Sequence, residues 1–205
     1  EGGKIDYASH ANDGGTVLRE VLDFDKAIKV AYDFYMQHPD ETLIVVTADH
    51  ETGGMALGNS DYTLNLKVLA EQKCSSDLLS DQLSALQKEA GKHLTWEQVK
   101  EVISKNTGLY TVVEISKEED QLLQAAFEQM MQHQGVEKSL YKDINALASK
   151  ALALLNQKSR LGWTSKGHTA SAVPVFAIGV GAERFTGWHD NSEIAPLIYE
   201  ATQSH

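Results

Sequence analysis

The chain has 205 residues, of which 42% are hydrophobic and 23% are charged, a balance that is typical of a folded globular protein and excludes a disordered one. This length allows one domain with a full core, or one domain that carries a sizeable insertion. The formal net charge of −11 argues against nucleic acid as a partner, because phosphate backbones select basic surfaces, and an anionic substrate would need a local cation.

The first 60 residues predict alternating helix and strand. A short helical stretch is expected over 6–12, and a long helix over about 16–37, where Pro39 follows its end. The run 42–48 is apolar and β-branched, which is typical of a strand buried on both faces of a parallel sheet.

The middle of the chain, residues 61–160, predicts a mainly helical insertion without a chemical constellation. Tyr62–Gln72 alternates in polarity and is expected to form one strand. Helices are expected over 77–90, 95–105, 117–133 and 139–158, two of which begin with capping boxes at Thr95 and Ser116.

The last 45 residues return to the first pattern. The apolar run 172–178 predicts a second buried strand in the same sheet, and Asp190 is a candidate N-cap for a final helix that ends near 203. We therefore expect an α/β domain built from residues 1–60 and 161–205, in which a predominantly parallel sheet is flanked by helices.

The single cysteine, Cys74, excludes an internal disulfide and a cysteine-rich zinc site, and we interpret it as a structural thiol. No run of 18 apolar residues is present, so nothing is expected to span a membrane. The chain opens on a motif without a signal segment, and we expect it to be part of a longer polypeptide.

Two pairs of side chains have the spacing and chemistry of metal ligands. Asp6 and His10 lie four residues apart on the first helical stretch, so that both can reach one zinc ion; a solvated ion pair is the alternative. Asp49 and His50 follow the first buried strand, at the sheet edge where α/β proteins bind ligands, although a polar loop start has the same pattern.

His168 precedes the second strand and is a third candidate, although a lone histidine there is most often part of a loop. The other histidines have no partner at metal-ligand spacing, and His189 lies nearest to the same sheet edge. Histidine or aspartate from three separate segments at one sheet edge is the arrangement of a metallohydrolase.

Three motifs also occur in the order found in one family: Glu1-Gly-Gly-x-Ile-Asp6-x-x-x-His10-x-Asn12-Asp13, Val-Thr-Ala-Asp49-His50-Glu-Thr-Gly-Gly and Gly167-His168-Thr-Ala-x-x-Val-Pro-Val. Together with the closing Phe185-Thr-Gly-x-x-Asp190-Asn191-Ser192, the chain resembles the C-terminal portion of bacterial alkaline phosphatases. The resemblance covers about the first 60 and the last 45 residues.

The resemblance implies a metal-dependent phosphomonoester hydrolase with two zinc ions and one magnesium ion. Asp6, His10 and His168 would hold the first zinc, Asp49 and His50 the second, and Glu1 the magnesium, a hard cation that favours oxygen ligands. It also implies a phosphate monoester as substrate and a periplasmic or secreted location, and it allows a homodimer.

One departure from the family is decisive for the chemistry. The family's nucleophilic serine, its phosphate-binding arginine and its remaining metal ligands belong to an N-terminal half, so no catalytic nucleophile is expected in this chain. Two alternatives stay open: a metal-dependent mutase or phosphodiesterase of the same superfamily, and a catalytically silent helical interaction fragment.

Overall fold

The computed structural model describes residues 1–59, 62–138 and 140–203, and the chain folds into two compact units. We call Glu1–Val21 with Thr52–Gly167 the helical unit, and Leu22–Glu51 with His168–His205 the strand unit. Helix α2 (Gly14–Tyr35) begins in the helical unit and ends in the strand unit. Two short strands, β2 (Glu51–Thr52) and β7 (His168–Thr169), lie where the chain passes from one unit to the other.

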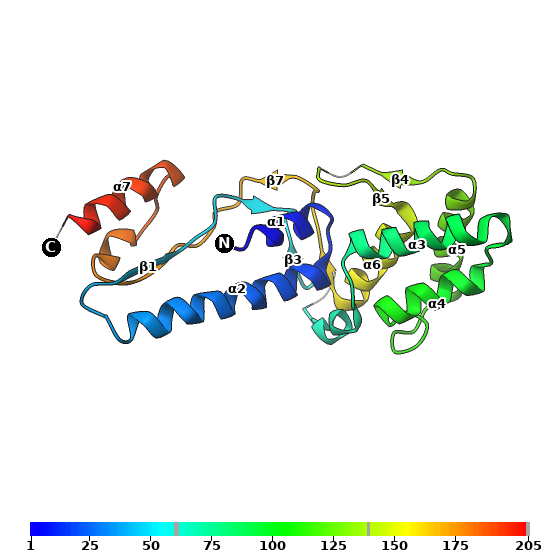
Figure 1. The fold of residues 1–205 in the computed structure, drawn as a ribbon, viewed down its shortest axis with the longest axis horizontal. Helices are drawn as coiled ribbons and strands as arrows, with labels where there is room; N and C mark the ends of the chain where they lie inside the picture. The colour runs from blue at the N-terminus through cyan, green and yellow to red at the C-terminus, as the bar shows by residue number, and fades with distance from the viewer. Residues whose placement is uncertain (60–61, 139, 204–205) are drawn as a thin grey trace. The chain divides into compact units, whose positions relative to one another are not determined.

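The helical unit contains α1, the start of α2 and a group of four helices, which Figure 1 shows packed together. Its helices are α1 (Gly3–His10), α3 (Ser76–Ala90), α4 (Trp96–Thr107), α5 (Lys117–Met131) and α6 (Ala146–Ser159), with the 3-10 turns η1 (Leu66–Glu71) and η2 (Gly91–His93). Two antiparallel strand pairs join them: β3 (Ala56–Leu57) with β6 (Leu161–Gly162), and β4 (Val136–Glu137) with β5 (Ile144–Asn145).

The core of the helical unit is formed by apolar side chains that recur at helical spacing. Helix α6 contributes most of its leucines and alanines to this core and packs against α3, α4 and α5. Side chains with at most 1% of their surface exposed come from all four helices: Leu79, Leu83, Val99, Ile103, Leu123, Leu147 and Leu155. The helical patterns of this region therefore correspond to real buried faces.

Local signals predicted where two of these helices, α4 and α5, begin. Both expected capping boxes are present, with Thr95 paired to Gln98 and Ser116 paired to Glu119. The side chain of each N-cap accepts a hydrogen bond from a backbone N–H that the helix itself cannot satisfy, which explains why such signals are reliable.

Two predictions in this region are wrong. Tyr62–Gln72 is not a strand: the 3-10 turn η1 lies there, and Leu69 faces the core. The helix expected over 139–158 begins only at Ala146, because the Asn145 side chain caps it and the preceding residues pair as β4 and β5. Residue 139 itself lies outside the described residues.

The strand unit is built on a two-stranded ribbon of β1 (Leu43–Val46) and β8 (Phe176–Gly179), visible beside α7 in Figure 1. The two runs share a sheet as predicted, but they pair antiparallel, with Leu43 opposite Gly179 and Val46 opposite Phe176. The predicted parallel arrangement is therefore wrong for this pair. An apolar β-branched run indicates a buried strand, but it carries no information on the direction of its neighbour.

The remaining elements of the strand unit follow the ribbon. The 3-10 turn η3 (Ala182–Phe185) leads to α7 (Asn191–Thr202), where Asp190 and Glu193 form a third capping box at the predicted N-cap. Burial on both faces of the strands is not seen among the described residues, because Phe176 is 63% exposed. None of the helices in the described part of the chain is both long enough and apolar enough to cross a lipid bilayer.

Candidate metal centre

Helix α1 places the first predicted ligand pair on one face. The Nε2 atom of His10 lies 3.4 Å from Oδ1 of Asp6, as the spacing of four residues predicts. The His10 side chain is only 4% exposed and that of Asp6 is 27% exposed. Because the histidine is buried, the pair is more than a solvated ion pair on a helix surface.

The tautomer of His10 follows from its second contact. Its Nδ1 atom lies 2.6 Å from the backbone carbonyl oxygen of Lys166, which can only accept a hydrogen bond. Nδ1 therefore carries the proton, and in the neutral ring the lone pair is on Nε2, the atom directed at Asp6. A backbone carbonyl that orients the ring in this way is typical of metal-binding histidines.

Gly53 holds the segment that provides this carbonyl. Its N–H donates to the carbonyl of Gly167 at 2.9 Å, and its own carbonyl accepts from Thr164 and Ser165 at 3.1 Å. Gly53 has a φ of +88°, and a β-carbon there would lie 2.6 Å from the ring of Trp163. Any larger residue would therefore displace the segment 163–167, which supports His10 through the Lys166 carbonyl.

Both carboxylate oxygens of Asp6 accept hydrogen bonds from residues distant in sequence. Thr52 Oγ1 donates to Oδ1 at 2.6 Å, and the Tyr141 hydroxyl donates to Oδ2 at 2.8 Å. Sequence reasoning missed both partners. Thr52 lies inside the Asp49–Gly54 motif, which could have indicated it. Tyr141 lies in residues 61–160, which we call the helical region, where no local pattern indicates a contact with α1.

The turn after α1 is held by a buried carboxylate. Asn12 adopts a positive φ of 53°, which asparagine tolerates well, and Asp13 is fully buried. The Asp13 side chain accepts from the N–H and hydroxyl of Thr16, from Gln72 and from the N–H of Ser76. This network fixes the metal-ligand helix to the start of α3.

The other predicted ligands belong to the strand unit. Asp49 and His50 follow β1, with Asp49 Oδ2 at 3.3 Å from His50 Nε2, and the Asp49 side chain is 84% exposed. The ring of His50 stacks on that of His168, with centroids 3.5 Å apart and planes inclined by 22°. Next to this stack, the Thr169 hydroxyl donates to a carboxylate oxygen of Glu51.

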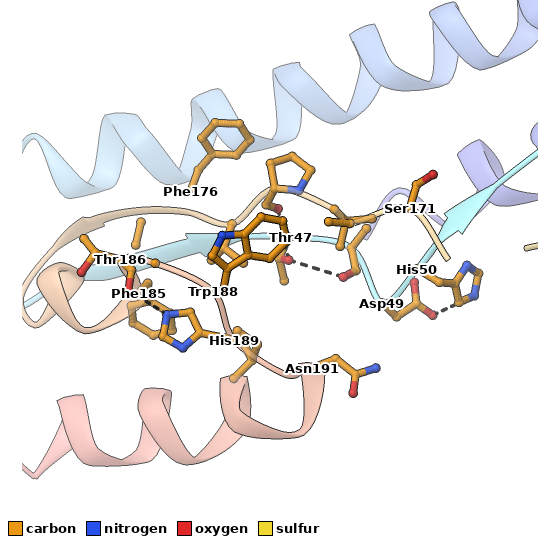
Figure 2. Close-up of a pocket in the computed structure, with 18 of the residues that line it drawn as sticks. Thr47, Asp49, His50, Ser171, Phe176, Phe185, Thr186, Trp188, His189 and Asn191 are labelled. Atoms are coloured by element: carbon orange, nitrogen blue, oxygen red, sulfur yellow. Dashed lines mark hydrogen bonds and ion pairs between the residues drawn. The ribbon is translucent and has the colours of Figure 1, made fainter. Parts of the chain in front are cut away.

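A pocket of about 1000 Å³ opens beside Asp49 and His50 in the strand unit. Figure 2 shows Trp188 and His189 on its wall, on the segment between η3 and α7. Trp188 is 88% exposed, and His189 Nε2 donates to the Thr186 carbonyl at 3.1 Å. His189 thus has a hydrogen-bond partner within its own segment.

The structure therefore brings Asp6 and His10 together in one unit, and His50 and His168 together in the other. Glu1 is exposed at the start of the helical unit. That all of these side chains converge on shared ions stays a prediction.

Comparison with known proteins gives a decisive match. The family model described as alkaline phosphatase matches residues 1–204. The chain belongs to the alkaline phosphatase family. Alkaline phosphatase 4 of Bacillus subtilis (strain 168) is 31% identical over 201 residues, which are 98% of this chain and 38% of that protein.

Solved structures agree with this assignment. The cold-active alkaline phosphatase of a psychrophilic Shewanella species matches with a TM-score of 0.75 and 31% identity, over 98% of this chain and 44% of that one. The alkaline phosphatase of Thermus thermophilus matches with a TM-score of 0.70 and 27% identity, over 100% of this chain and 43% of that one. The chain thus spans about two fifths of the relatives' length, and the matched part includes the helical region.

Proposed function

We propose that this alkaline phosphatase family chain supplies most of the zinc ligands of a phosphomonoester hydrolase, but not its nucleophile. The observation that carries the proposal is the geometry of His10. Its Nδ1 proton is bound by the Lys166 carbonyl, and its Nε2 is directed at the Asp6 carboxylate. A buried imidazole whose tautomer is set in this way beside a carboxylate is a prepared half-site for zinc.

The donor chemistry fits the metals that the resemblance implies. Asp6, His10 and His168 would hold the first zinc, which binds nitrogen and oxygen donors and keeps a fourth position open in catalytic sites. Asp49 and His50 would provide two ligands of the second zinc. Glu1, an oxygen donor, would serve a magnesium ion.

The role of each of the chain's own residues follows from this assignment. When bound, the zinc ions supply Lewis-acid stabilisation of phosphoryl oxygens and a hydroxide at moderate pH. Lys166 keeps the His10 ring oriented through its carbonyl, and Thr52 fixes Oδ1 of Asp6. A local cation of this kind is needed because the chain's charge of −11 repels a phosphate ester.

We further propose that the phosphorylated serine and the phosphate-binding arginine lie outside this chain. Ser9 is buried and its hydroxyl donates to the Ile5 carbonyl at 2.7 Å, while Ser165 bonds to the backbone of Gly167. Neither serine lies in the motif of the family's nucleophile. A homodimer and a periplasmic or secreted location remain expectations that rest on the resemblance.

Metal removal tests the proposed function in the complete polypeptide that contains this chain. We expect chelation to abolish hydrolysis of an aryl phosphate monoester, and zinc with magnesium to restore it. His168→Ala should lower zinc content and activity, whereas His93→Ala, at an exposed histidine in η2, should change neither. Preferred turnover of a phosphodiester or phosphoryl transfer within a sugar phosphate would favour the alternative functions, and full activity after chelation would overturn the proposal.

The 205-residue chain on its own provides a second test. Because it holds three ligands of one zinc site but no nucleophile, we expect about one zinc per chain and no appreciable turnover. Robust hydrolysis by this chain alone would show that its residues include the nucleophile.

A further inference from the structure

The helical region contributes a tyrosine to the candidate metal centre. Between α5 and α6 the chain forms the antiparallel pair β4–β5, seen above the helices in Figure 1, and Tyr141 lies on the connection between the two strands. This connection and α1 both belong to the helical unit. No residue of this region was assigned a chemical role from the sequence.

Tyr141 makes three different contacts with α1. Its hydroxyl donates to Asp6 Oδ2 at 2.8 Å. Its ring stacks on Tyr7, with centroids 3.6 Å apart and an interplanar angle of 20°, and meets the His10 ring edge-on at 5.5 Å. A side chain that touches both members of a ligand pair constrains their relative orientation.

Side-chain contacts hold the described residues Glu137 and Lys142, on either side of Tyr141. On the β5 side, Lys142 Nζ lies 2.7 Å from both carboxylate oxygens of Asp81 on α3. On the β4 side, Glu137 accepts from Lys166 at 2.6 Å and from Ser149 at 2.8 Å. These contacts limit the positions that Tyr141 can occupy, and one of them involves the residue whose carbonyl orients His10.

We propose that Tyr141 is a positioning residue for the Asp6 ligand, an inference that rests on the proposed zinc site. Its hydroxyl holds Oδ2 and thereby turns Oδ1 toward Thr52 and the Nε2 of His10. Because Thr52 holds Oδ1 and Tyr141 holds Oδ2, the carboxylate is already oriented and loses little side-chain freedom when a metal binds. Loss of such outer contacts typically costs 10- to 100-fold in metal affinity or activity.

The test compares Tyr141→Phe with Tyr110→Phe in the complete polypeptide. Tyr110 is a matched control, because its hydroxyl also donates to an aspartate, Asp120, at 2.8 Å within the same unit but away from the predicted ligands. Zinc affinity is measured by competition with a chromophoric chelator. The visible spectrum of the cobalt-substituted protein reports the ligand geometry directly.

We expect Tyr141→Phe to weaken zinc binding by about tenfold or more and to alter the cobalt spectrum. Tyr110→Phe should change neither, although it removes an equivalent hydrogen bond. In the zinc-saturated enzyme, Tyr141→Phe should lower kcat more than it raises KM, because it displaces a ligand rather than a substrate contact.

The outcomes separate this inference from the proposed function. If the wild-type protein binds zinc and Tyr141→Phe binds it equally well with an unchanged cobalt spectrum, only the role of Tyr141 is overturned. Wild-type protein that binds no zinc would overturn the proposed function and this inference together. Equal losses in Tyr141→Phe and Tyr110→Phe would indicate a general effect on folding and would also contradict the positioning role.

Discussion

Replacement of Asp13 by alanine tests how α1 is joined to the helical unit. The Asp13 carboxylate is fully buried. It accepts from the Thr16 N–H at 3.1 Å, as an N-cap of α2 does, and from the Ser76 N–H at 2.7 Å at the start of α3. Gln72 Nε2 donates to it at 2.5 Å. One side chain therefore satisfies donors from three segments.

The expected cost follows from the donors that alanine would leave behind. Each buried donor without an acceptor costs about 1–3 kcal/mol, and the loss of an N-cap costs about 1 kcal/mol. Partial relaxation around the smaller side chain reduces the sum. We therefore expect Asp13→Ala to lower the free energy of unfolding by about 3–5 kcal/mol, the cost of the lost cap together with the neutral donors of Gln72 and Ser76 that lose their acceptor.

Urea unfolding followed by circular dichroism measures this change. Asp13→Asn should cost less, because it keeps the volume and one acceptor oxygen. Asp23→Ala on the same helix should stay within about 0.5 kcal/mol of wild type, since the Asp23 side chain is 76% exposed. A loss below 1 kcal/mol for Asp13→Ala, or equal losses for Asp13 and Asp23, would refute the reasoning.

Three further predictions concern the helical unit. Burial raises the pKa of the Cys74 thiol to about 11, so its reaction with a disulfide reagent at pH 8 should be slow until urea unfolds the protein. Burial opposes ionisation of Glu137, but the hydrogen bonds from Lys166 and Ser149 prevail and lower its pKa from the ordinary value of 4.5. The ionised carboxylate therefore stabilises the folded protein above pH 4.5, and this stabilisation is lost as the pH falls through the lowered pKa. Glu137→Gln should reduce this loss of stability at acid pH in urea unfolding. Leu147→Ala should cost about 2–5 kcal/mol in the same measurement, whereas Leu122→Ala, at a position that is 64% exposed, should stay within about 0.5 kcal/mol.

Local chemistry explains which parts of the fold could be predicted. Caps such as Thr95 and Ser116 act over three residues, so the helix starts that depend on them were correct. Strand direction depends on a partner more than a hundred residues away, and the apolar runs that form β1 and β8 contain no information about it. The β4–β5 pair was missed because two-residue strands are too short to show a period.

In the candidate site, too, the local contacts could be predicted from the sequence and the long-range contacts could not. The Asp6–His10 contact arises within one helical turn and was predicted from spacing alone. The contacts that give this pair its chemistry, from the Lys166 carbonyl and the Tyr141 hydroxyl, join residues more than a hundred positions apart. A backbone carbonyl has no sequence signature at all, so only the fold reveals that the His10 tautomer is set.

Through these contacts the helical region helps to position the ligands of the proposed metal site. Helix α1 has eight residues, too few for a helix to be stable alone in water. Its ligand geometry therefore depends on contacts from outside the helix, and those of Asp13 and Tyr141 join it to the helical region. Zinc bound by Asp6 and His10 would favour the folded form of the helical unit. By linkage, the free energy with which either contact favours zinc binding equals the free energy with which bound zinc strengthens that contact. A helical segment without ligands of its own can thus tune the affinity of the site, because it supplies the surface on which the ligand helix is held.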